Sequence, residues 1–204
     1  MVQPRRNSFL THRVDNQPPP LVPFDAWATD LPLREAVSRE GGGWAGADLA
    51  EYGRRVGGDL AEAGFAANEN RPKLRAFDRY GHRIDEVEFH PAYHRLMAEA
   101  IARGVPSFGW RHEGQPGAQV ARMALAYLHN QADQGTGCPL TMTYACVPTL
   151  RHQPELAAEW LPRVLSTTYD PRSAPAALKS GVTVGMGMTE KQGGSDVRAN
   201  TTRA

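Results

Sequence analysis

The segment PLTMTYACVPTL, residues 139–150, is apolar almost all the way round a helical projection. A helix of this kind is stable only where other helices cover it, so the segment predicts a helix at the centre of a bundle. Pro139 fits the first turn of such a helix, whereas Pro148 predicts a kink or an end. This segment therefore requires further helices with apolar faces around it.

Amphipathic segments on both sides supply those faces. In residues 46–70, the side chains of Leu49, Tyr52, Val56 and Leu60 recur at spacings of three and four, the signature of one buried helical face. Glycines within this segment weaken the prediction. Helical periodicity also covers residues 33–40, 93–104, 117–135 and 154–166. The expected buried face of the third of these consists of Val120, Met123, Ala124, Tyr127, Leu128 and Gln131.

Two segments depart from the helical pattern. Residues 73–89 alternate apolar and polar side chains around Tyr80-Gly81, as a short hairpin or an irregular crossing does. The first thirty residues contain a cluster of prolines, which predicts an extended arm. Hydrophobic residues of the arm have little to bury locally, so we expect docking on the body or on a neighbouring subunit, with plain disorder as the alternative. These residues are Phe9, Leu10, Val14, Leu21, Val22, Phe24 and Trp27.

The architecture is expected to change after the helices. Residues 181–188, GVTVGMGM, are short and β-branched at three successive positions, which predicts a buried strand that opens a second domain. The expected fold class is therefore mainly α. A Pro-rich arm spans residues 1–30, a helical domain spans 31–178, and the first strand and loop of a β-domain span 179–204.

Charge and hydropathy exclude several partners. The chain has 23 Lys and Arg against 22 Asp and Glu, so no net field favours nucleic acid or an anionic membrane. No run approaches the roughly 20 apolar residues of a membrane span, and the N-terminus lacks the apolar core of a signal peptide. These features predict a soluble, cytoplasmic protein. Cys138 and Cys146 match neither a redox motif nor a zinc-ligand pair and are expected to be reduced, buried thiols.

The segment GMGMTEKQGGSD, residues 185–196, carries the residues best suited to chemistry. Gly187 would leave main-chain groups open to a flat heterocycle, and Thr189 adds a hydroxyl that donates and accepts. Gly193 and Gly194 allow close approach, after which Ser195 offers an amide and a hydroxyl to a phosphate oxygen. Residue types alone also fit an ordinary turn.

The same segment resembles a known signature. TEKQGGSDV is similar to the TE-x-x-x-GSD signature of acyl-CoA dehydrogenases, and the longer run through NTTRA resembles the AidB branch of that family, which is isovaleryl-CoA dehydrogenase-like. Upstream, NQPPPL, EAVSREGGGW, FHPAYHRLM and CPLTMTYACVP resemble the same branch in the same order. The resemblance covers most of the chain and implies that it is the N-terminal part of such a protein.

In this family the signature follows the first strand of the middle β-domain and contacts FAD. The resemblance implies Met188 and Thr189 at the isoalloxazine, Ser195 near the pyrophosphate, and Thr189 also at the border of the acyl-CoA pocket. The common family form has a proline after Thr-Glu, where this chain has Lys191, which leaves the loop shape and acyl-chain preference open. The implied cofactor-binding residues are Met186, Gly187, Met188, Thr189, Glu190, Lys191, Gln192, Gly193, Gly194 and Ser195.

Other candidate residues have simpler interpretations. His90 and His94 are four apart but lack a third ligand, so we expect no metal. Four side chains on the helix 139–150 either face the flavin pocket or take part in core packing: Thr141, Met142, Thr143 and Tyr144. The family's proton-abstracting glutamate comes from its C-terminal helical domain. We therefore assign no catalytic residue in this chain. Glu190, Lys191 and Asp196 are interpreted as charged loop residues without an acid-base role.

The resemblance implies α,β-dehydrogenation of an acyl-CoA such as isovaleryl-CoA, a role in the response to DNA alkylation, and a homotetramer when full length. Any DNA contact would come only from the C-terminal region beyond this chain. We expect the 204-residue chain alone to be inactive. The alternative is a non-catalytic protein, either a flavin-bearing assembly protein or a DNA-protection protein.

Overall fold

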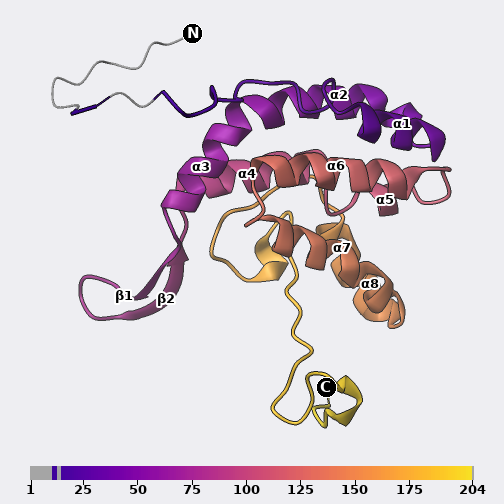
Figure 1. Ribbon diagram of the computed structural model, residues 1–204. Helices are drawn as coiled ribbons and strands as arrows, with labels where there is room; N and C mark the ends of the chain where they lie inside the picture. Colours follow the sequence, from indigo (N-terminus) through magenta and orange to yellow (C-terminus); the bar gives the residue numbers. More distant parts are fainter. Residues whose placement is uncertain (1–10, 13–14, 204) are drawn as a thin grey trace.

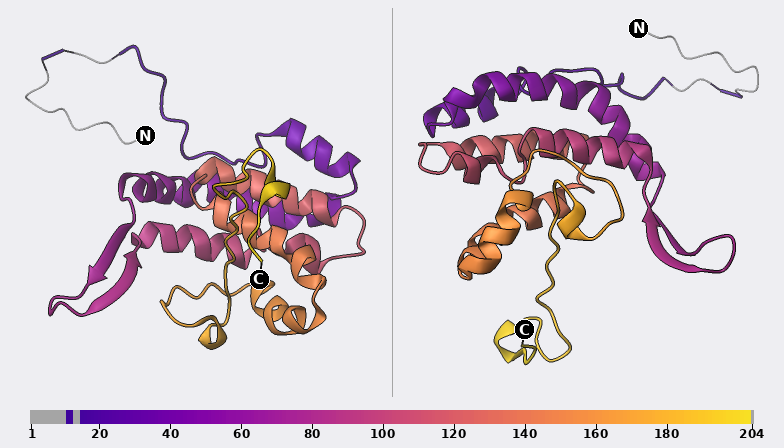
Figure 2. Two further views of the ribbon diagram at one scale, coloured as in Figure 1. Left: turned by 90° about the horizontal axis from the view of Figure 1, so that it is seen from below. Right: turned by 180° about the vertical axis from the view of Figure 1, so that it is seen from behind.

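The structure is a computed structural model that describes residues 11–12 and 15–203. The helices form layers: α1, α2 and α3 lie over α4, α5 and α6, and α7 and α8 lie on the other side of that middle layer (Figure 1). A two-stranded hairpin projects from one end, and the C-terminal segment extends away from the helices (Figures 1 and 2). None of the helices in these described ranges is long and apolar enough to cross a membrane.

The helices predicted from periodicity all form, with short 3-10 turns between or after them at Gly43–Ala45, Ala176–Leu178 and Val197–Ala199. The predicted helix over residues 46–70 is confirmed as two α-helices joined by a π-helical turn, Val56–Leu60. The helices are α1 Leu31–Arg39, α2 Gly46–Arg55, α3 Ala61–Glu69, α4 Pro91–Ala102, α5 Phe108–Arg111, α6 Ala118–Ala132, α7 Gly137–Arg151 and α8 Pro154–Val164.

Local sequence explains several helix ends. The side chain of Asp30 accepts from the Leu33 amide at the start of α1, and His90 accepts from the Ala92 amide at the start of α4. After α4, Gly104 adopts φ +79, the left-handed conformation that glycine favours after a helix. These caps fix where the chain enters and leaves each layer.

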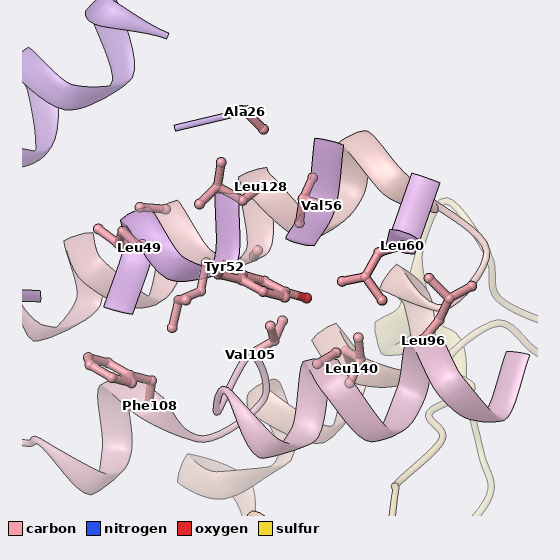
Figure 3. Packing of buried hydrophobic residues seen from close by; sticks show 14 of the residues in the cluster. Ala26, Leu49, Tyr52, Val56, Leu60, Leu96, Val105, Phe108, Leu128 and Leu140 are labelled. Atoms are coloured by element: carbon pink, nitrogen blue, oxygen red, sulfur yellow. The ribbon is translucent and has the colours of Figure 1, made fainter. Parts of the chain in front are cut away.

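The core forms around the face predicted for residues 46–70. Leu49, Tyr52, Val56 and Leu60 are each at most 1% exposed. Tyr52 lies near the centre of the cluster with its hydroxyl directed into it (Figure 3). The interaction of α2 and of the π-helical turn with the middle layer is thus built on the helical repeat seen in the sequence.

The buried face predicted for α6 is partly wrong. Ala124 and Leu128 are buried, but Met123 is 60% and Tyr127 is 48% exposed, and Gln131 is exposed as well. The reason is that α6 packs against α2 on one side and against α5 and α7 on another, so its buried surface is wider and differently centred. Its buried residues are Ala118, Ala121, Arg122, Ala124, Leu125, Ala126, Leu128 and His129.

Helix α7 is less enclosed than predicted. Within the described chain, only Leu140, Thr143 and Val147 are fully buried, because helices cover one side of α7 and leave the rest partly open. Pro148 neither ends nor breaks the helix, which continues to Arg151. The prediction that α7 lies at the centre of a bundle is therefore wrong for this chain by itself.

The hairpin predicted over residues 73–89 is confirmed. Strands β1 (Lys73–Phe77) and β2 (Arg83–Glu88) pair antiparallel, with Leu74 opposite Val87. The turn contains Gly81 at φ +85. Both strands are almost wholly exposed, since the hairpin extends beyond the helices (Figure 2).

Residues 181–188, predicted as a strand, are extended but pair with no strand in the part of the chain that the structure describes. The Val182 amide instead donates to the Arg163 carbonyl at 3.3 Å, and the Val184 amide donates to Thr143 Oγ1 at 3.0 Å. A strand is defined by its neighbour, and no partner strand follows within residues 189–203. The segment is therefore anchored to helices at its beginning and open further on.

Part of the N-terminal arm docks on its own chain. The Phe24 amide donates to the Gly57 carbonyl at 2.9 Å, and the Ala26 amide donates to the Gly53 carbonyl at 3.1 Å. Of the arm's hydrophobic residues, Phe9, Leu10 and Val14 lie outside the described residues. Gly53 and Gly57, two of the glycines that weakened the helix prediction, form a shallow groove here, because their missing side chains let the arm's main chain approach.

Replacing Gly57 by alanine should release this part of the arm. A Cβ on Gly57 would lie 2.1 Å from the Phe24 carbonyl oxygen, so the arm must move away. We expect the amides of Phe24 and Ala26 to exchange hydrogen at least about tenfold faster, measured by NMR or mass spectrometry. Gly46→Ala is the control, since a Cβ there meets nothing within 4 Å. Unchanged exchange in Gly57→Ala would show that the docking does not depend on this groove.

Candidate functional site

The signature segment forms a turn at the open end of the chain. Residues 186–188 are extended, and a tight turn follows, in which the Glu190 amide donates to the Gly193 carbonyl at 2.9 Å and the Gly193 amide donates back to the Glu190 carbonyl at 3.3 Å. Thr189, Lys191, Gln192, Gly194 and Ser195 lie in or beside this turn. All residues of the segment except Glu190 and Gly193 are exposed.

Asn200 holds the turn from behind. Its Nδ2 donates to the Met188 carbonyl at 2.6 Å, and a Cβ on Gly193 would lie 2.4 Å from Asn200 Oδ1. Asp196 accepts from the Arg198 amide at 3.1 Å, which starts the short turn that brings Asn200 back. The supporting role of Asn200 was not predicted, because a contact twelve residues along the chain leaves no periodic signal. Asp196 has a structural role, as expected of a loop charge.

The main chain before the turn is open. The amides of Gly187, Met188 and Thr189 donate no hydrogen bond to any residue in the described ranges. A Cβ on Gly187 would meet nothing within 4 Å, and the side chains of Met186 and Met188 are 55% and 59% exposed. Three successive exposed amides that donate to no described residue, beside flexible thioether side chains, suit a flat heterocycle with polar edges.

Helix α7 anchors the segment that leads to the turn. Thr143 is 1% exposed, and its Oγ1 donates to the Pro139 carbonyl at 2.7 Å while accepting from the Val184 amide. Met142 Sδ lies 3.3 Å from the Met186 amide. Of the two interpretations of this helix, packing holds for Thr143 and Tyr144, whereas Thr141 is exposed. The sequence did not predict that Thr143 would bind the extended segment.

A second polar cluster lies inside the helical core. Tyr52 OH is 2.7 Å from His129 Nδ1, and His129 Nε2 is 2.7 Å from Thr136 Oγ1. Thr136 Oγ1 donates to Asp133 Oδ2 at 2.6 Å, so it accepts from His129 Nε2–H, and His129 Nδ1 accepts from Tyr52. Burial lowers the pKa of His129 to about 4. Burial likewise raises the pKa of Tyr52 above its usual range. This chain of hydrogen bonds was missed because its members are far apart in sequence.

The remaining candidates have structural contacts. His90 caps α4, and His94 Nδ1 lies 2.7 Å from Tyr169 OH, with burial lowering the pKa of His94. No group of three or more His, Cys, Asp or Glu side chains gathers as a metal site among the described residues. Cys138 is exposed, so the expectation that it is buried is wrong, and Cys146 is half-buried. Neither histidine belongs to the segment 186–195.

Comparisons with known proteins identify the family of the chain. Residues 16–171 match the family described as "Adaptive response protein AidB N-terminal domain". The chain is 45% identical over 198 residues to the Escherichia coli protein named "Putative acyl-CoA dehydrogenase AidB". It is 31% identical over 157 residues to "Acyl-CoA dehydrogenase family member 11" of Caenorhabditis elegans. These alignments cover 96% and 74% of this chain but only 37% and 24% of the two relatives.

Two solved structures share the fold. "Bd2924 apo-form" superposes with a TM-score of 0.75 at 25% identity, covering 87% of this chain and 35% of that one. Caenorhabditis elegans ACDH-11, in a structure titled as a complex with C11-CoA, superposes with a TM-score of 0.76 at 24% identity, covering 99% of this chain and 34% of that one. The chain thus belongs to the AidB N-terminal domain family and is an N-terminal part of an acyl-CoA dehydrogenase-like protein.

Proposed function

We propose that this chain supplies the helical N-terminal domain and the first flavin-binding loop of an FAD-dependent acyl-CoA dehydrogenase. One observation carries the proposal: residues 187–189 present three exposed amides that donate to no described residue, directly after a segment that α7 holds in place. Main-chain donors of this kind match the polar edge of an isoalloxazine ring. The residues present therefore fit the group that the family uses.

The proposed contacts follow the order of the loop. Met188 and Thr189 lie against the ring, and Ser195, exposed after the turn, offers its amide and hydroxyl to the pyrophosphate. Thr189 also borders the acyl-CoA pocket. When bound, FAD accepts the hydride that leaves the substrate. The chain's own residues orient the ring, and the catalytic base comes from another part of the protein. The proposed domain organisation is an arm over residues 1–30, a helical domain over 31–178 and the start of a β-domain over 179–204.

The proposed substrate is an acyl-CoA, with isovaleryl-CoA as the specific candidate. The names of both relatives refer to acyl-CoA dehydrogenases, and one structural neighbour is titled as a complex with C11-CoA. A carboxylate outside this chain would remove the α-proton. We propose further that the full-length protein is a cytoplasmic homotetramer that takes part in the response to DNA alkylation.

Anaerobic titration of the full-length protein with isovaleryl-CoA tests this function. Bleaching of the flavin absorption band is expected, because reduction of the ring removes that band. A bound flavin that stays oxidised with isovaleryl-CoA and with acyl-CoAs of other chain lengths would contradict dehydrogenation. That result would favour the non-catalytic alternative.

Gly193→Val should deplete FAD in the full-length protein. The new Cβ would lie 2.4 Å from both Asn200 Oδ1 and the Asp196 carbonyl oxygen, so the turn must open. Overpacking of this kind costs about 1–3 kcal/mol, and we expect roughly tenfold weaker FAD retention. The measurement is FAD per subunit after gel filtration, with Gly46→Ala as the control. If the native protein, Gly193→Val and Gly46→Ala retained equal amounts of FAD per subunit, this loop would not be part of the flavin site.

A further inference from the structure

Tyr144 is fixed on two faces and at its hydroxyl. Its ring lies between the guanidinium of Arg122, 3.8 Å from the ring centroid, and the indole of Trp110, with centroids 5.1 Å apart and planes 26° apart. Its hydroxyl donates to Gln119 Oε1 at 2.6 Å. These contacts join α7 to α5 and to α6, so the ring of Tyr144 cannot turn without breaking several of them at once.

Pro148 adds a main-chain contact to this cluster. Proline has no N–H, so the carbonyl four residues earlier, that of Tyr144, loses its usual helical donor. Trp110 Nε1 donates to this carbonyl at 2.9 Å. The tryptophan thus stacks on the ring of Tyr144 and also replaces its missing helical hydrogen bond. This explains why α7 continues through Pro148.

Arg122 makes the cluster sensitive to the loss of Tyr144. Arg122 is 5% exposed, its Nε donates to the Val105 carbonyl at 3.0 Å, and its Nη2 is buried without a hydrogen-bond partner. No carboxylate pairs with it within residues 15–203. The π face of Tyr144 and the Val105 carbonyl are therefore the contacts that compensate this buried cation. Burial accordingly lowers the pKa of the Arg122 guanidinium.

The residues just before Tyr144 face the extended segment. Successive residues of an α-helix point about 100° apart, since a turn takes 3.6 residues. With Tyr144 directed at α5 and α6, Thr143 is directed at the Val184 amide and Met142 at the Met186 amide. A rotation of α7 about its axis would move both anchors together.

We propose that Tyr144, held by Trp110 and Arg122, is a positioning residue: it fixes the rotation of α7 and thereby the place of residues 184–188. The consequence for the flavin rests on the function proposed above. The hydrogen bonds and ring contacts of Tyr144 within the described residues go to α5 and α6, so Tyr144 acts on the segment through Thr143 and Met142. Its effect on the cofactor is therefore on orientation.

Tyr144→Leu and Tyr144→Phe in the full-length protein test this role. The leucine variant loses the stack, the cation-π contact and the hydroxyl, whereas phenylalanine keeps the ring. In Tyr144→Leu we expect roughly tenfold weaker FAD binding, a shifted flavin absorption band and about tenfold faster hydrogen exchange at the amides of Val184 and Met186. Tyr144→Phe should restore all three to within about threefold of the native values. Tyr80→Leu, at a 69% exposed tyrosine of the hairpin, is the matched control.

A second variant separates positioning from folding. If Tyr144→Leu does not fold, Trp110→Phe keeps an aromatic ring but removes the donor to the Tyr144 carbonyl and part of the stacking surface. It should change the same three measurements in the same direction. Native exchange at Val184 and Met186 in a folded variant would overturn the proposal. A native protein that holds no FAD would instead contradict the proposed function, and the exchange measurements would then decide the role of Tyr144 alone.

Discussion

Gly64→Ala is expected to lower the free energy of unfolding by about 2–3 kcal/mol. A Cβ on Gly64 would lie 1.9 Å from the Ala132 carbonyl oxygen and 3.0 Å from its carbon. Neither atom belongs to a flexible side chain, so α3 and the end of α6 must separate. Alanine favours a helix more than glycine does, but that gain of at most about 1 kcal/mol is smaller than the loss of packing. Denaturant unfolding followed by circular dichroism measures the difference.

The control for this substitution is Gly46→Ala in α2. A Cβ there meets nothing within 4 Å, and Gly46 has a helical φ of −56. We expect a gain of about 0.5–1 kcal/mol, because alanine restricts the unfolded chain. If the Gly64→Ala variant were as stable as the Gly46→Ala variant, that result would contradict the close packing of α3 against the end of α6.

Acidification from pH 6.5 to pH 4 is expected to remove on the order of 3 kcal/mol of stability through His129 alone. Burial lowers the pKa of His129 to about 4, against an ordinary value of 6.5. Between these two values the unfolded state binds a proton that the folded state does not. Stability is therefore fully present above pH 6.5, falls as the pH decreases, and has lost this contribution near pH 4.

His129→Gln isolates this contribution. Glutamine keeps a donor and an acceptor for Thr136 and Tyr52 but does not titrate in this range. The variant should be less stable at pH 7 and should lose less stability on acidification, measured by denaturant unfolding at several pH values. His152→Gln, at an exposed histidine after α7, should retain the native slope. A native slope in His129→Gln would show that other groups cause the acid sensitivity.

The sequence predicted the positions of the helices in this fold better than the neighbours against which each helix packs. The spacing of Leu49, Tyr52, Val56 and Leu60 identifies a buried face because α2 and the π-helical turn after it pack on the same layer. The same reasoning misplaced Met123 and Tyr127, since α6 has neighbours on more than one side and periodicity records only the strongest face. Helix phase can thus be read from sequence, whereas the number of neighbours cannot.

Prediction of the candidate site was limited in the same way. The loop residues were identified by their types and by the family signature, but their support was not. Thr143 and Asn200 bind main-chain atoms 41 and 12 residues away, and neither contact leaves a local pattern. Pro148 was expected to kink or end α7 because proline removes a helical donor. The replacement donor, Trp110, could not be foreseen because it lies 34 residues from the carbonyl that it binds. Contacts of this kind are fixed only when the layers assemble.

The groove that receives Phe24 and Ala26 places one shared steric requirement on two separate parts of the sequence. Gly53 and Gly57 lack side chains where the arm's main chain lies on them, so a larger residue at either position is tolerated only if the arm moves or is lost. Among related proteins we therefore expect these two helix positions to vary together with the presence of the arm. Lineages without it would be free to accept alanine there and gain helix stability.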